Sequence, residues 1–221
     1  MTSALADHPF STAALDGLIA RHGEAPWLSE RRREALQLFT ELSETPLDPE
    51  EYKRLDLRTF RPEKYRLIDT ASSLDASGFS TLMRDRAEFG GAVVHVDGRC
   101  VTSQLDESLA AKGVLYGDLK TLLESHREVL EPYFLTKAVR PDADRFAAWH
   151  AAFWTGGTVL YVPRNVEITA PLYSLIGLQQ DEATDLSHTL IILEEELPRL
   201  CWKRLRPPMN RTKGCTSALS N

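Results

Sequence analysis

The first clear hydrophobic pattern follows a polar leader and predicts a helix between Ser29 and Pro46. Ser29 can cap the first turn, because its side chain can accept a hydrogen bond from a backbone N–H there. The arginines Arg31–Arg33 lie among acidic residues and are interpreted as a water-facing surface. The apolar stripe of this helix consists of Leu28, Ala35, Leu36, Phe39 and Leu42.

Asp97 and Gly98 separate two runs rich in β-branched residues, 92–96 and 99–102. This arrangement predicts a β-hairpin, since both central residues of a type I′ turn have positive φ. His95 lies in the first strand of the hairpin. We interpret it as a packed or edge-facing strand residue, because no second His, Cys or carboxylate stands beside it at the spacing of a metal site.

Two helices are predicted between the hairpin and residue 157. The first spans 105–130, with leucines on one stripe. The second begins at a cap formed by Asp142 or Asp144 and stops at Gly156–Gly157, where glycine can adopt the left-handed conformation. Its aromatic stripe is interpreted as core, because nothing polar converges on it as in a cofactor site. The stripe consists of Phe146, Trp149 and Phe153.

Short apolar runs after residue 157 predict strands. The runs are separated by turn residues, and no helix between them is long enough for a βαβ unit. The pattern therefore indicates either an all-β sandwich or a parallel solenoid and leaves both open. The predicted strands are 159–162, 166–168, 172–176 and 190–193.

Charge divides the chain into two unlike parts. The net charge of −6 argues against nucleic-acid binding, which needs an excess of Lys and Arg. Residues 1–197 carry 20 basic and 32 acidic residues, a net charge of −12, whereas residues 198–221 carry six basic residues and no acidic one. We expect this tail to be disordered and foreign in character to the rest of the chain.

The chain contains no apolar run of the roughly 20 residues that span a membrane. Its three cysteines, Cys100, Cys201 and Cys215, are too scattered for a disulfide framework and include no CxxC pair. Reducing, cytoplasmic surroundings fit this usage best.

No active site emerges from the residue pattern. The six histidines are dispersed, and neither a GxSxG nor an HExxH motif occurs. Among Glu194–Glu196, adjacent carboxylates would point to opposite faces of a strand, so neighbours in this run do not form a carboxylate pair. We therefore assign no catalytic, cofactor-binding or metal-binding residue and expect no enzymatic activity and no cofactor bound by this chain.

One stretch of the chain has the pattern of a known protein family. It comprises residues 144–166 (DRFAAWHAAFWTGGTVLYVPRNV) and Pro171–Leu172, and it resembles the SufB/SufD family of iron-sulfur cluster assembly proteins. The segments 113–119 (GVLYGDL) and 187–192 (SHTLII) match the same family pattern. Near the N-terminus, Trp27–Leu28 and residues 50–57 (EEYKRLDL) resemble the SufD branch.

The resemblance implies an α+β chain in which an N-terminal helical region leads into the start of a right-handed parallel β-helix. We expect a mainly helical region over 1–90, an α/β lead-in with the first β-helix coils over 91–197, and the aberrant basic tail over 198–221. The resemblance further implies a non-catalytic scaffold that acts with SufB-like and SufC-like partners, without nucleic acid or membrane.

The likeness to the family ends near Glu196, which leads us to expect a truncation or a shift of reading frame there. The family's C-terminal helices, which contact the ATPase SufC, lie beyond that point, so the SufC contact is expected to be lost. A cut solenoid would also expose strand edges, so we expect that end to self-associate. Two alternatives stay open: a β-solenoid enzyme acting on a sugar or acyl substrate, and a fragment without function.

Overall fold

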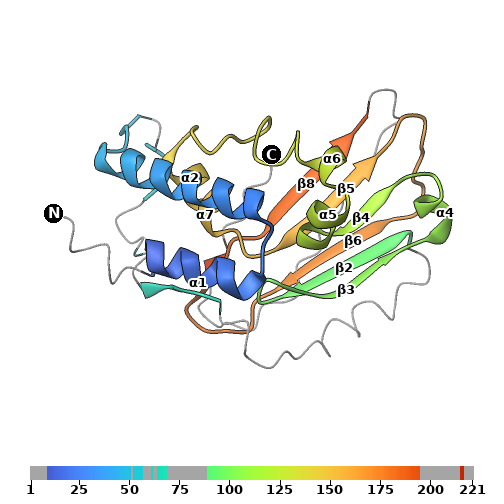
Figure 1. Cartoon of the computed structure of the whole chain (residues 1–221), viewed down its shortest axis with the longest axis horizontal. Helices are drawn as coiled ribbons and strands as arrows, with labels where there is room; N and C mark the ends of the chain where they lie inside the picture. The colour runs from blue at the N-terminus through green and yellow to red at the C-terminus, as the bar shows by residue number, and fades with distance from the viewer. Residues whose placement is uncertain are drawn as a thin grey trace. The chain divides into compact units, whose positions relative to one another are not determined.

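The computed structural model describes residues 9–50, 52–56, 61, 64–68, 89–194 and 215–216. These residues form a mixed α+β fold with N-terminal helices and small sheets (Figure 1). The chain divides into two compact units that do not follow chain order, and each is described by itself below. Unit 1 comprises Met1–Leu67, Leu135–Trp154 and Glu182–Thr184, and unit 2 comprises Ile68–Phe134, Thr155–Asp181 and Asp185–Asn221.

Unit 1 begins with a helix where the sequence suggested a polar leader. Helix α1 (Thr12–His22) is capped by Ser11, whose side chain accepts a hydrogen bond from the N–H of Ala14. It ends at Gly23, which has the left-handed φ of 57° typical of a helix terminus. Ser11 and Gly23 are ordinary start and stop signals of a helix.

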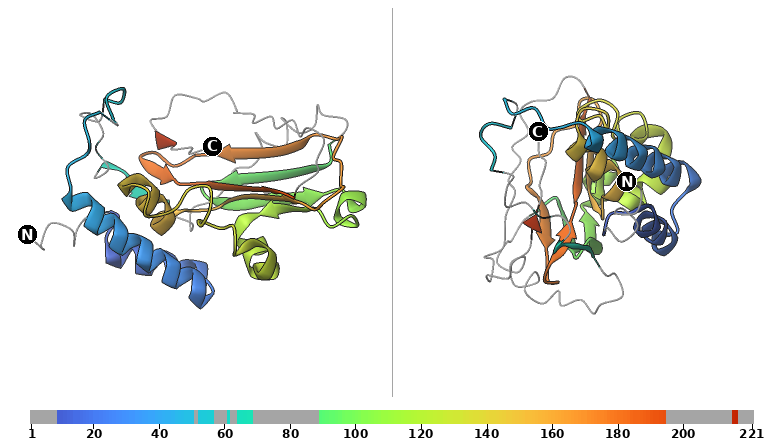
Figure 2. Two further views of the ribbon diagram at one scale, coloured as in Figure 1. Left: turned by 90° about the horizontal axis from the view of Figure 1, so that it is seen from above. Right: turned by 90° about the vertical axis from the view of Figure 1, so that its left-hand side faces the viewer.

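Helix α2 (Pro26–Glu44) lies beside α1 (Figures 1 and 2) and begins one turn before the predicted cap. Proline at its first position needs no N–H partner, so the helix starts there without a side-chain cap. Ser29 lies inside the helix and is buried. The apolar stripe is confirmed at Leu28, Ala35 and Leu36, which are buried.

Arg32 contradicts the prediction of a water-facing arginine triplet, since it is 1% exposed. Its Nε and Nη2 donate to the two carboxylate oxygens of Glu24, each at 2.7 Å, and its Nη1 donates to the carbonyl oxygen of Ala152 at 2.8 Å. The guanidinium also lies 4.0 Å from the ring centroid of Trp154. Burial is possible because the charge is paired and its hydrogen bonds are made.

Helix α7 (Arg145–Phe153) packs on α2 and confirms two predictions. Asp144 caps it, with one carboxylate oxygen accepting hydrogen bonds from Phe146 N–H and Ala147 N–H at 2.7 and 2.9 Å. The aromatic stripe is core: Trp149 and Phe153 are buried, and Phe10 meets both rings edge-on. Unit 1 also contains the short strand β1 (Arg66–Leu67), which pairs in parallel with Ala183 and Thr184.

His150, buried on α7, makes the stability of unit 1 depend on pH. Burial chiefly, and then the positive charge of Arg32, lower the pKa of His150 from 6.5 to about 4. Between these values the unfolded chain binds a proton that the folded chain does not, so stability falls as pH falls through this window. From pH 7 to pH 5 we expect a loss of about 2 kcal/mol in the free energy of unfolding.

Urea unfolding of the native chain and of His150→Gln at both pH values checks this expectation. The variant should lose about 2 kcal/mol less than the native chain over the same interval. An equal loss in the two proteins would show that His150 does not carry the pH dependence.

Unit 2 is built from two three-stranded sheets, visible as two groups of arrows in Figure 1. In each, the central strand pairs antiparallel on one side and parallel on the other. The first sheet has the order β3 (Arg99–Leu105), β2 (Gly91–Val96), β6 (Leu172–Gly177), and the second has the order β4 (Leu115–Asp118), β5 (Gly157–Val162), β8 (His188–Leu193). Two of the three residues of β7 (Ala183–Asp185) belong to unit 1, and β9 (Cys215–Thr216) belongs to unit 2.

The predicted hairpin is confirmed as β2 and β3. Asp97 and Gly98 connect the strands with φ angles of 49° and 68°, as a type I′ turn requires, and Val96 lies opposite Arg99. The side chain of Asp97 in this turn also accepts hydrogen bonds from the N–H groups of Gln179 and Gln180.

Three other predictions for unit 2 were wrong. The helix over 105–130 is interrupted by β4, leaving the short helices α4 (Glu107–Ala110), α5 (Leu119–Ser125) and α6 (Arg127–Leu130). Residues 166–168 are loop, not strand. Gly156–Gly157 does not stop a helix but opens β5, where a Cβ on Gly157 would overlap with the carbonyl oxygen of His188.

The path of the chain through the two sheets is regular. It leaves β5, forms β6 in the other sheet, and returns as β8 in parallel with β5, with Val159 opposite Leu190. Both faces of β5 are buried, at Val159 and Leu160, whereas β8 buries one face, at Leu190 and Ile192, and exposes Ile191 on the other.

In the part of the chain that the structure describes, no helix is long and apolar enough to cross a membrane. Most of the region between residues 57 and 88 lies outside the described residues. The basic tail from residue 198, with the expected disorder and frame shift, also lies outside them, apart from β9.

Candidate functional site, a possible metal centre

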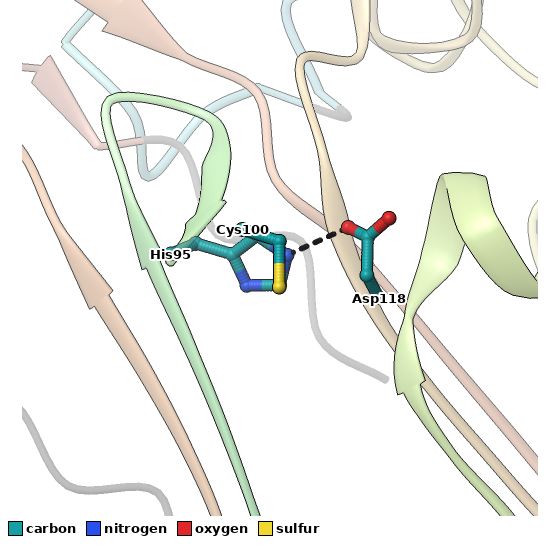
Figure 3. Close-up of side chains that lie close together, drawn as sticks. All are labelled: His95, Cys100 and Asp118. Atoms are coloured by element: carbon teal, nitrogen blue, oxygen red, sulfur yellow. Dashed lines mark hydrogen bonds and ion pairs between the residues drawn. The ribbon is translucent and has the colours of Figure 1, made fainter. Parts of the chain in front are cut away.

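Three potential metal ligands come together in unit 2 (Figure 3). They are His95, Cys100 and Asp118, and one ligand atom from each lies within 4.8 Å of the other two. The trio joins a borderline nitrogen donor, a soft sulfur donor and a hard oxygen donor, the set that proteins use for zinc and similar ions.

The hairpin brings two of these residues together. His95 on β2 lies directly opposite Cys100 on β3, and the register of the pair shifts between Val94 and His95. Such an irregularity adds a residue to one strand and re-aims the side chains beside it. His95 is fully buried, whereas Cys100 is exposed, so the pair reaches from the interior to the surface.

Asp118 comes from the junction of β4 and α5. It caps α5, since its Oδ2 accepts hydrogen bonds from Thr121 N–H at 2.9 Å and Thr121 Oγ1 at 2.8 Å. Its Oδ1 lies 3.0 Å from His95 Nε2. Burial alone would raise the pKa of Asp118, but the hydrogen bonds from His95 and Thr121 outweigh it and hold that pKa below its usual value.

The thiol of Cys100 favours its protonated form. Burial chiefly, and then the negative charge of Asp118, raise its pKa from 9.0 to about 11. Its Sγ donates a weak hydrogen bond to the carbonyl oxygen of Thr102 at 3.4 Å. A metal ion would reverse this state, because a coordinating thiol is deprotonated.

A second polar group lies in electrostatic reach of His95. Asp185 accepts hydrogen bonds at Oδ1 from Thr155 Oγ1 at 2.7 Å and from Ser187 Oγ at 2.8 Å. Burial raises the pKa of Asp185, and an interaction with His95 opposes that rise. Among the described residues, neither Asp185 Oδ2 nor His95 Nδ1 has a hydrogen-bond partner, and both atoms are buried.

The sequence interpretation of His95 was right about its packing and wrong about its neighbours. Cys100 and Asp118, both potential ligands, lie beside it. The hairpin could have revealed Cys100, because Asp97–Gly98 sets which residues oppose each other. Asp118 is 23 positions away on another strand, and no spacing rule indicates its approach.

Comparison with known proteins identifies the family to which this chain belongs. The model of the family described as "SufBD protein N-terminal region" matches residues 15–173. The chain belongs to the SufBD family. This confirms the resemblance seen in the sequence, and the match includes all three residues of the candidate metal site.

Curated members of the SufBD family are distant relatives of this chain. The iron-sulfur cluster assembly protein SufD of Bacillus subtilis is 27% identical over 179 residues, which are 79% of this chain and 40% of that protein. An iron-sulfur cluster assembly SufBD family protein of Staphylococcus haemolyticus is 26% identical over 211 residues, 88% of this chain and 41% of that protein. A SufBD family protein of Mycobacterium tuberculosis is 27% identical over 210 residues, 88% of this chain and 24% of that protein. The chain thus spans less than half the length of these relatives.

Proposed function

We propose that this SufBD-family chain acts as a non-catalytic, SufD-like scaffold subunit in iron-sulfur cluster assembly. The observation that carries the proposal is the family match over residues 15–173, which is most of the described chain. The similarity to the Bacillus subtilis SufD protein supports the SufD-like role over a SufB-like one. The proposal includes SufB-like and SufC-like partners and a cytoplasmic location.

The strand path of unit 2 supports the further proposal that it begins a right-handed parallel β-helix. In such a solenoid, successive turns of the chain add parallel strands to the same sheets. β8 adds to β5 in this way, and β6 adds to β2. The proposal keeps the division expected from the sequence. It consists of a mainly helical region over 1–90, the α/β lead-in with the first β-helix coils over 91–197, and the basic tail over 198–221.

Co-purification tests the proposal. The full chain is co-expressed with affinity-tagged SufB-like protein and untagged SufC-like protein from the same organism, and each pair is also tested alone. We expect the chain to be retained with the SufB-like protein. We expect it to retain the SufC-like protein only when the SufB-like protein is present, because the family resemblance assigns the direct SufC contact to C-terminal helices.

Two controls make the result interpretable. Gly17→Ala, on the surface of α1, should leave retention unchanged, and circular dichroism establishes that each chain is folded. A folded chain that binds neither protein contradicts the scaffold proposal and favours a fragment without this function. Direct retention of the SufC-like protein without the SufB-like protein contradicts the assignment of that contact.

A further inference from the structure

We propose that His95, Cys100 and Asp118 bind one divalent transition-metal ion of the zinc class. The proposal rests on side chains of unit 2 and does not depend on the scaffold role, so the isolated chain can be used to test it. The site would join the hairpin, through His95 and Cys100, to the junction of β4 and α5, through Asp118.

The three ligand atoms need only small movements to reach coordination geometry. Two tetrahedral ligands at 2.0 to 2.1 Å from a metal lie about 3.3 Å apart. His95 Nε2 and Asp118 Oδ1 already lie 3.0 Å apart. A thiolate at about 2.3 Å would lie about 3.5 Å from either of them. Cys100 Sγ lies within 4.8 Å of the other two ligand atoms, so it has the remaining, short distance to move.

The donor set selects the class of ion. A thiolate and an imidazole favour zinc and the neighbouring first-row metals over magnesium and calcium, which prefer oxygen alone. Three protein ligands leave one position of a tetrahedron for water or an outside ligand. The exposure of Cys100 gives that position access to solvent.

Metal binding also explains the two buried atoms without partners. The proton on Nε2 of His95 faces Asp118, and Nδ1 has no hydrogen-bond partner among the described residues. A metal on Nε2 displaces that proton and leaves the ring proton on Nδ1. A metal-bound histidine normally donates this second N–H to a carboxylate or carbonyl oxygen. Asp185 is a buried carboxylate of the same unit, and its Oδ2 has no hydrogen-bond partner among the described residues.

Cobalt provides a direct probe, because a thiolate bound to Co²⁺ gives a charge-transfer absorption that water and carboxylate ligands do not. The reduced full chain is titrated with CoCl₂, and ZnCl₂ is then added to displace the cobalt. We expect one equivalent of Co²⁺ to produce the thiolate band and Zn²⁺ to remove it. Zinc should also protect Cys100 from alkylation by iodoacetamide, as followed by peptide mass spectrometry.

Variants separate this site from other thiols in the chain. Cys100→Ser changes an exposed side chain, so the fold should survive, and we expect it to remove the band and weaken binding at least tenfold. The matched control is the double variant Cys201→Ser with Cys215→Ser, which should keep the band and the one-to-one stoichiometry. His126→Gln serves as a control for a partly exposed histidine outside the trio.

Asp118→Asn and Asp185→Asn test the two carboxylates. Asparagine can still cap α5, so Asp118→Asn should fold and bind the metal more weakly. Asp185→Asn should weaken binding by about 10- to 100-fold while keeping the band, as expected of a group that orients a ligand. The proposal is overturned if Co²⁺ gives no saturable band, if the band survives Cys100→Ser, or if the cysteine double variant loses it.

Discussion

Replacing Glu24 with alanine is expected to lower the free energy of unfolding by about 3 to 5 kcal/mol. Glu24 has a fully buried side chain and holds the guanidinium of Arg32 through two hydrogen bonds of 2.7 Å. Removal of the carboxylate leaves an arginine that is 1% exposed without its counter-charge. An unpaired buried charge costs far more than the lost contact alone. Chemical denaturation of the variant and the native chain measures the difference.

The neighbouring ion pair supplies a control on the same helix. Arg33 Nη2 lies 3.3 Å from Asp16 Oδ1, with both side chains more than half exposed. Asp16→Ala should therefore change stability by less than about 1 kcal/mol. If Asp16→Ala and Glu24→Ala lower the free energy of unfolding by the same amount, burial does not govern the strength of the Arg32 interaction as we describe it.

Substitution of Gly157 by alanine is expected to destabilise unit 2 by about 3 kcal/mol or more. An alanine Cβ at this position would overlap with the carbonyl oxygen of His188 and lie 2.7 Å from its carbonyl carbon. These atoms belong to the backbone of β8, which cannot withdraw without breaking its parallel pairing with β5. The φ angle of Gly157, 154°, is also one that side-chain-bearing residues rarely adopt. Thermal and urea unfolding report the loss.

Gly17→Ala is the matched glycine control, with the opposite sign. Gly17 lies inside α1, and its added Cβ would meet only the far end of the Arg21 side chain at 3.4 Å. Alanine is favoured over glycine within a helix, so this variant should gain about 0.5 to 1 kcal/mol. A destabilised Gly17→Ala, or a Gly157→Ala as stable as the native chain, would contradict the packing described for the two sites.

Local patterns were sufficient to predict the elements whose determinants are local. The hairpin follows from Asp97–Gly98, and the start of α7 follows from Asp144, because in each case the decisive residues are adjacent to the structure they specify. The break at β4 was missed because its four residues lie within a longer helical rhythm of leucines. Tyr116, buried in β4, packs in a core cluster with Leu160 of β5, a partner 44 positions away.

Arg32 shows why charge patterns mislead about burial. Three consecutive arginines among glutamates favour a solvated face, and for Arg33 that expectation is met. Arg32 is buried because Glu24 lies eight positions earlier and the Ala152 carbonyl 120 positions later. The same limit applies to the candidate metal site, where the hairpin predicts the pairing of His95 with Cys100 but nothing local predicts Asp118.

The sequence separation between paired strands in unit 2 determines the loop-closure entropy that folding must overcome. Pairing Gly157 with His188 closes a loop of 31 positions, whereas pairing Gly91 with Leu172 closes one of 81. The longer closure costs about 0.9 kcal/mol more in loop entropy. When Asp118 first pairs with Thr158, the 40 positions between them are removed from that longer loop. The pairing of β4 with β5 therefore lowers the entropic cost of pairing β2 with β6, which couples the formation of the two sheets although neither contains more than three strands.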